Sequence, residues 1–166
     1  MERFQISKQN ALQRIKAADH MLTQTYPMIR DARILLSVVN NIYQALEHCV
    51  SAVLYYDRLL RKIPPFHDNF ESKFHVFRNA SAMHHNLTGY IPLISAVKEI
   101  EERHKSSAVE FSKKDSFVIC DENYQYKVIN AESLKKLLNE AKRLYVEIEK
   151  ITKSYSLAED ENAGVS

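Results

Sequence analysis

Residues that interrupt regular secondary structure are scarce in this sequence. The 166 residues include only 2 Gly, 4 Pro and no Trp. Because Gly and Pro punctuate most turns, their scarcity indicates a few long helices joined by few loops. Hydrophobic residues make up 45% and charged residues 27%, the ordinary mix of a globular protein. The length favours a single domain, since typical domains have about 100–150 residues.

Cysteines and long apolar runs are also nearly missing. The 2 cysteines, Cys49 and Cys120, form no CxxC pair and sit among apolar residues, so buried free thiols in a reducing compartment are expected. No apolar run approaches ~18 residues and the N-terminal segment is polar, so neither a membrane span nor a signal peptide is predicted. The protein is therefore expected to be cytoplasmic.

Several catalytic signatures are missing too. The sequence has no Gly-rich phosphate loop, no serine-histidine-aspartate order and no zinc-ligand spacing. Nucleotide-triphosphate hydrolysis, classical hydrolase chemistry, a cofactor and a bound metal are accordingly not expected. The net charge is only +2, from 23 Lys and Arg against 21 Asp and Glu, which excludes the strong basic excess of a nucleic-acid coat.

Apolar residues recur with helical spacing along most of the chain. The clearest pattern runs from Leu35 to Ile63 in alternating steps of four and three, and Pro64 and Pro65 end it. Asn130 is expected to cap the last helix. Helices are predicted over residues 7–25, 35–63, 68–85, 92–105 and 131–157.

One short region departs from the helical pattern. Residues 116–129 are rich in β-branched and aromatic side chains around an acidic turn, which predicts a β-hairpin. Residues 158–166 are acidic and small, which predicts a disordered tail. The fold class expected is all-α: an up-and-down bundle of about five helices in one domain, residues 1–157, with a small hairpin inserted before the C-terminal helix.

Residues 77–86, FRNASAMHHN, place unusual polar residues within a helical pattern. On a regular α-helix His84 lies seven residues after Phe77 and continues the apolar stripe, with Arg78 beside it. His75, Arg78 and His85 then form a flanking polar strip. A simpler explanation is a half-buried structural histidine and an arginine that snorkels from the helix flank.

This segment resembles the signature of HEPN domains, in which an arginine, usually followed by Asn, Asp or His, precedes a histidine by four to six residues. Arg78 and Asn79 are followed by His84 after five residues and by His85 after six, so both histidines fit. HEPN domains are bundles of four or five helices that usually dimerise. Many nuclease members carry a tyrosine two residues after the histidine, where this chain has Asn86 or Leu87.

The resemblance implies a metal-independent endoribonuclease that cleaves single-stranded RNA at a dimer cleft. His84 or His85 would move protons, Arg78 would bind the scissile phosphate, and Asn79 would orient either group. The resemblance also implies a homodimer and, in a toxin–antitoxin setting, a nucleotidyltransferase-like antitoxin as partner. The alternative is a non-catalytic helical module for dimerisation or for binding RNA, a nucleotide or a protein.

Other polar residues have competing explanations. Glu101 and His104 match half of a di-iron bundle site, but no second Glu-x-x-His occurs, so an exposed helix end is expected. Glu47 and His48 either support the arginine–histidine motif or form an ordinary polar face.

The hairpin region combines aromatic and basic residues. The rings are suited to stack on bases, but also to cover the end of the bundle or to pair across the strands. The lysines suit a phosphate contact or a solvated surface. The rings are those of Phe117, Tyr124 and Tyr126, and the lysines are Lys113, Lys114 and Lys127.

Overall fold

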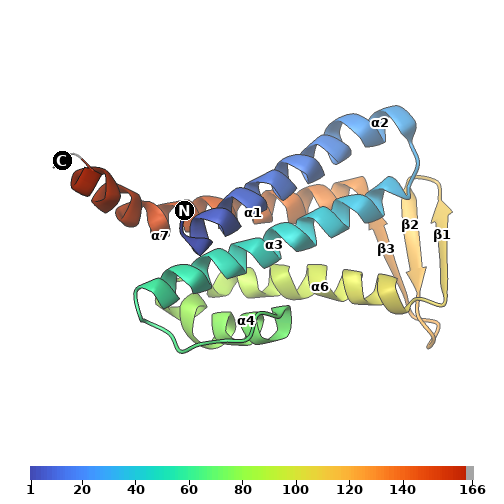
Figure 1. Cartoon of the computed structure of the whole chain (residues 1–166). Helices are drawn as coiled ribbons and strands as arrows, with labels where there is room; N and C mark the ends of the chain where they lie inside the picture. Colours follow the sequence, from blue (N-terminus) through green and yellow to red (C-terminus); the bar gives the residue numbers. More distant parts are fainter. Residues whose placement is uncertain (164–166) are drawn as a thin grey trace.

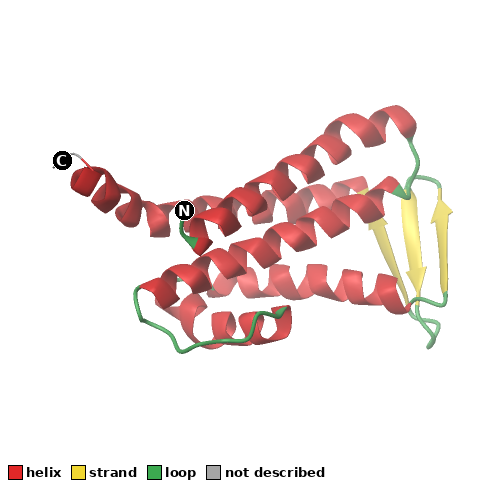
Figure 2. Ribbon diagram, viewed as in Figure 1, coloured by secondary structure: helices red, strands yellow, loops and turns green. Residues whose placement is uncertain are grey.

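The computed structural model describes residues 1–163, with side chains described for residues 1–155. It is a bundle of long helices with a small sheet at one end (Figures 1 and 2). Over the described residues, no helix combines the length and the apolar character needed to cross a membrane. The expected all-α bundle is present, and a small three-stranded sheet adds β structure at one end of it.

The first helical arm begins earlier and ends later than predicted. It comprises α1 (Arg3–His20), a π-helical turn η1 (Met21–Thr25) and α2 (Tyr26–Ile29). Glu2 forms a capping box with Gln5, whose side-chain oxygen accepts a 2.8 Å bond from the Glu2 N–H, so Ser7 is a buried helical residue rather than the cap. Pro27 does not stop the arm because it lies in the first turn of α2, directly after the π turn.

The central helix is α3 (Ile34–Leu59), as its long apolar period predicts. It packs along α1 and also touches α6 and α7, so its buried surface extends over more than one face (Figure 1). It ends before Pro64, because Arg61 takes a left-handed conformation, with φ 56°, and the Lys62 N–H donates 2.8 Å to the Asp57 carbonyl.

The third helical segment comprises α4 (Phe70–Val76), a second π turn η2 (Phe77–Ser81) and α5 (Ala82–His84). Asn69 caps it by accepting a 2.8 Å bond from the Ser72 N–H. A short 3₁₀ turn, η3 (Thr88–Tyr90), leads into α6 (Ile91–Ser106), which has Pro92 in its first turn. The segment from α4 to α5 and the helix α6 agree with the helices predicted over residues 68–85 and 92–105.

The predicted hairpin is part of a three-stranded antiparallel sheet in the order β1-β2-β3. The strands are β1 (Val109–Lys113), β2 (Ser116–Cys120) and β3 (Tyr126–Asn130). The inner face buries Phe117, Ile119 and Ile129, and the sheet closes one end of the bundle (Figure 2). The edge strand β1 was not predicted, because four of its five residues are exposed and contribute no apolar run.

The last helix, α7 (Ala131–Ala163), begins where predicted. Asn130 caps it, since its side-chain oxygen accepts a 2.8 Å bond from the Ser133 N–H. The helix continues through residues 158–163, where the composition predicts disorder, and residues 164–166 lie outside the described residues. Near its other end, Tyr155 and Tyr56 hold the ring of Phe4 edge-on, each at 5.3 Å between ring centroids.

Candidate functional site

A π-helical turn determines which of the two adjacent histidines, His84 or His85, points into the bundle. In η2 the Ala82 N–H donates to the Phe77 carbonyl, five residues back, so this turn holds one residue more than an α-helical turn. After the π turn, the face that Phe77 begins continues at His85 rather than at His84. His85 accordingly turns inward, with a side chain 13% exposed, whereas His84 is exposed to solvent.

The end of α5 holds His85 in place. Asn86 adopts a left-handed conformation, with φ 57°, and the Leu87 N–H donates 2.7 Å to the Ala82 carbonyl. Leu87 is buried and anchors this cap in the core. His85 is thereby fixed as the C-cap residue, directly after the last residue of α5.

His85 meets a buried carboxylate near the end of α3. Its Nε2 lies 2.7 Å from Oδ1 of Asp57, and the Ser81 hydroxyl donates 2.6 Å to Oδ2 of the same carboxylate. Asp57 is 1% exposed and Ser81 is fully buried. Among the described residues no buried side-chain nitrogen or oxygen lacks a hydrogen-bond partner, so the cost of burying this carboxylate is offset by both donors.

The two hydrogen bonds define the chemistry that His85 can perform. A carboxylate only accepts hydrogen bonds, and here both of its oxygens accept, one from Ser81 and one from His85. Nε2 of His85 therefore carries its hydrogen, and in the neutral ring Nδ1 is left with the lone pair. In catalytic triads a buried aspartate likewise orients an imidazole that acts as general base, but there the carboxylate accepts from Nδ1–H and Nε2 is the basic nitrogen.

Arg78 and Asn79 lie on the exposed side of the same segment. The Arg78 guanidinium carbon is 5.5 Å from the centroid of the Phe74 ring, and the Asn79 amide nitrogen is 3.2 Å from Nδ1 of His75. The structure thus brings His85 together with Asp57 and Ser81. The other three motif residues, Arg78, Asn79 and His84, are exposed to solvent. Among the described side chains, none of them forms a hydrogen bond or an ion pair with His85, Asp57 or Ser81.

The other polar candidates have local partners. Glu101 is 5% exposed rather than at an exposed helix end, and its carboxylate lies 3.5 Å from the Asn40 amide. His104 pairs instead with Glu110 of β1, at 2.6 Å. Within the described part of the chain, no three His, Cys, Asp or Glu side chains cluster closely enough to hold a metal ion.

His48 lies apart from the arginine–histidine motif. It lines a hollow of about 260 Å³ that also contains Arg3, Ser51 and Lys73. Burial, together with the charges of Arg14 and Lys73, lowers the pKa of His48, and Glu47 opposes that shift. His48 therefore lies where α1, α3 and α4 meet, and none of residues 77–86 lines this hollow.

The aromatic residues predicted for the hairpin differ in burial. Phe117 is 5% exposed and belongs to the core, as expected for rings that cover the bundle end, whereas Tyr124 and Tyr126 are exposed. Lys127 lies on the inner side of β3, next to the start of α7. The outer face of the sheet instead carries Phe111, from the strand that sequence patterns did not predict.

Comparisons with known proteins do not assign a family. A scan against protein-family models, a search of curated proteins and a search of solved structures each found no match.

Sequence reasoning overlooked two members of the site, Asp57 and Ser81. Asp57 interrupts the apolar run of residues 50–60, and a carboxylate in such a run is rarely buried unless a partner satisfies it. That signal could have marked Asp57 as a candidate. Its pairing with His85, 28 residues away, depends on how the two helix ends meet.

Proposed function

We propose that this chain is a HEPN-like, metal-independent endoribonuclease in which His85 is the proton-transfer residue. The supporting observation is the 2.7 Å contact between His85 and the buried carboxylate of Asp57, which fixes one imidazole with Nδ1 as its basic nitrogen. The resemblance of the Arg78–Asn79 and His84–His85 pattern to HEPN domains supplies the reaction class.

In the proposed reaction, Nδ1 of His85 removes the proton from a ribose 2′-hydroxyl. The 2′-oxygen then attacks the adjacent phosphorus, the bond from phosphorus to the 5′-oxygen breaks, and a 2′,3′-cyclic phosphate forms. A second imidazole, from a second copy of the chain, protonates the departing 5′-oxygen. Arg78 is exposed and permanently charged, so it can bind the phosphate and offset the negative charge that develops there.

The wider setting of the proposal comes from the same resemblance. It includes a homodimer and a nucleotidyltransferase-like antitoxin that restrains the nuclease. The proposed cytoplasmic location comes instead from the free cysteines and the polar N-terminal segment. Asn79 and His84 then act as secondary contacts to RNA, since both are exposed near Arg78 along the chain.

A second candidate function is a non-catalytic binding module, and one observation favours it. Arg78 lies over the Phe74 ring and Asn79 contacts His75, so two residues of the motif already have partners on their own helix. In this alternative the Asp57–His85 pair joins the ends of α3 and α5 and has no catalytic role.

The test is cleavage of a labelled single-stranded RNA by the purified protein in EDTA. We expect cyclic phosphate products from the parent protein and from His84→Ala, and a loss of activity of about 100-fold or more in Arg78→Ala and His85→Ala, the scale of general acid–base and charge stabilisation. Circular dichroism must show that each variant is folded at the assay temperature. A parent protein that leaves RNA intact would favour the binding module.

Asp57→Asn provides an independent check on the role of His85. The substituted amide can donate a hydrogen bond to Nε2, which stabilises the tautomer with the hydrogen on Nδ1 and removes the basic lone pair from that position. We expect reduced cleavage with little change in RNA affinity. Asp57→Asn that cleaves as fast as the parent would exclude a tautomer role for Asp57.

A further inference from the structure

The outer face of the three-stranded sheet carries exposed apolar side chains, and none of the helices packs over it within the described residues. The register places Phe111, Val118 and Val128 side by side across β1, β2 and β3. Their outward side chains border a groove of about 460 Å³. The lining residues are Phe111, Lys113, Lys114, Ser116, Val118, Cys120, Tyr126 and Val128.

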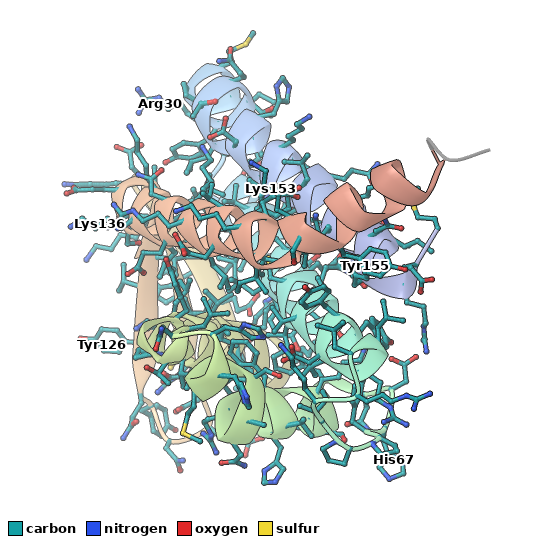
Figure 3. The ribbon with its side chains drawn as sticks, turned by 90° about the vertical axis from the view of Figure 1, so that its left-hand side faces the viewer. Arg30, His67, Tyr126, Lys136, Lys153 and Tyr155 are labelled. Carbon is teal, nitrogen blue, oxygen red and sulfur yellow. The ribbon has the colours of Figure 1, made fainter. Side chains whose placement is uncertain are left out.

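Two aromatic rings stand on opposite edge strands of this groove. Phe111 on β1 is 47% exposed and Tyr126 on β3 is 69% exposed, while Val118 between them is 7% exposed and forms the floor. Figure 3 shows the Tyr126 side chain projecting away from the ribbon. Strand spacing and rise place the two ring-bearing residues about 12 Å apart, since they are two strands and two residues removed.

The charge at one end of the groove is positive and uncompensated. Lys113 and Lys114 are exposed, and none of the ion pairs among the described side chains includes them. The nearest acidic residue in the turn, Asp115, pairs with Arg30 at 3.7 Å. This end is therefore suited to bind an anion.

The size of the face decides between classes of occupant. Three strands of five residues cover about 14 by 17 Å, or roughly 240 Å², whereas a stable protein interface buries about 800 Å² per partner. A second copy of the chain would find too little area here. The groove volume of about 460 Å³ falls within the range of about 300–1,000 Å³ typical of ligand sites.

We propose that the outer face of the sheet binds single-stranded RNA. Phe111 and Tyr126 stack on two bases, and Lys113 and Lys114 contact phosphates, the combination of rings and positive charge used to hold single strands. The inference takes its substrate class from the proposed function. The sheet adjoins the start of α3, so the length of that helix separates it from Asp57 by about 35 Å (Figure 1). The face is thus a separate RNA-holding site.

The first test measures affinity for a fluorescein-labelled 12-nucleotide 2′-O-methyl oligouridylate by fluorescence anisotropy. This probe lacks the 2′-hydroxyl and cannot be cleaved by the proposed reaction. We expect Phe111→Ala and Tyr126→Ala each to weaken binding by about fivefold to 150-fold, which corresponds to the ~1–3 kcal/mol typical of base–aromatic stacking. Tyr124→Ala is the matched control, because Tyr124 is 87% exposed but lies outside the groove, and it should change affinity less than twofold.

The second test measures the salt dependence of binding to the same probe. Replacing Lys113 and Lys114 by Gln should make the slope of log affinity against log salt less negative by about 1.4, or about 0.7 for each phosphate that a lysine no longer neutralises. Lys153→Gln on α7 is the control and should leave the slope unchanged, because Lys153 is also exposed but lies 22 residues after the start of α7, about 33 Å along the helix from β3.

Cys120 supplies a third test, because its side chain lines the groove. Saturating probe should slow alkylation of Cys120 by iodoacetamide at least fivefold. Cys49 is 1% exposed and serves as an unreactive internal reference.

The outcomes separate this inference from the nuclease proposal. Binding that depends on Phe111 and Tyr126, in a protein that leaves RNA uncut, would support RNA binding by the sheet face and would refute the proposed nuclease activity. RNA binding that neither variant affects, or unchanged alkylation of Cys120, would refute RNA binding by the sheet face and leave the nuclease proposal standing. Size-exclusion chromatography provides the last check: a dimer that dissociates in Phe111→Ala would assign the face to a second copy instead.

Discussion

Replacing each of the two adjacent histidines by alanine tests the register change caused by the π turn. His85→Ala removes a 2.7 Å hydrogen bond to a buried carboxylate, and a hydrogen bond to a charged group contributes about 1.5–3 kcal/mol. Breaking a fully buried ion pair costs about 3–5 kcal/mol. Because Ser81 still donates to Asp57 and the His85 side chain is 13% exposed, we expect an intermediate loss of about 2–4 kcal/mol.

His84→Ala is the matched control, since it removes the same side chain one residue earlier. His84 is exposed, and surface substitutions usually change the free energy of unfolding by no more than about 0.5 kcal/mol. Urea unfolding followed by circular dichroism measures both variants. With a slope of about 2 kcal/mol per molar urea, the midpoint of His85→Ala should fall by about 1–2 M and that of His84→Ala by less than about 0.3 M.

Equal midpoints for the two variants would refute the reasoning, because the inward turn of His85 and the outward turn of His84 both follow from the π turn. A double-mutant cycle with Asp57→Ala isolates the pair. Residues in direct contact typically show a coupling free energy of about 0.5–3 kcal/mol, and we expect a value in the upper half of that range. A coupling near zero would mean that the Asp57–His85 contact contributes nothing to stability.

Three other predictions address the core, the thiols and the pH dependence. Phe77→Ala should lower the free energy of unfolding by about 3–5 kcal/mol in thermal or urea unfolding, because the ring is fully buried at the start of the π turn. Native protein at pH 8 should take up one equivalent of iodoacetamide by mass spectrometry, at Cys120, because burial raises the pKa of Cys49 to about 12; uptake of two equivalents without denaturant would contradict this. Burial lowers the pKa of His48 from 6.5, so the unfolded chain binds the proton first and stability falls as pH drops below about 6.5; His48→Gln should flatten that decline in urea midpoints between about pH 7 and 5.

Local sequence patterns predicted the helices well where apolar residues repeat without interruption. The period from Leu35 onward gave the central helix its place, and Asn130 caps the last helix as expected. The first helix was predicted too short because a proline such as Pro27 normally ends a helix, although a preceding π turn lets this helix pass through it. The edge strand β1 escaped prediction because an exposed strand has no buried face to show a period.

The candidate site was predictable only in part. The stretch FRNASAMHHN identified the segment and left two histidines open, because the regular period of an α-helix assigns His84 to the face of Phe77. The π turn adds one residue to that period and assigns His85 instead. No propensity of residues 77–81 predicts such a turn, and the two residues that bound it are fully buried, Ser81 in a hydrogen bond to Asp57 of α3.

The sequence by itself determined a helical bundle with a β insertion before its last helix, because apolar periodicity and capping act between residues close along the chain. Only the tertiary structure decided that a carboxylate on α3 meets an imidazole 28 residues later, and that apolar side chains on the outer face of the sheet are exposed among the described residues. Contacts of that kind depend on where helix ends and strand edges come to lie, and nothing in the local pattern encodes those positions.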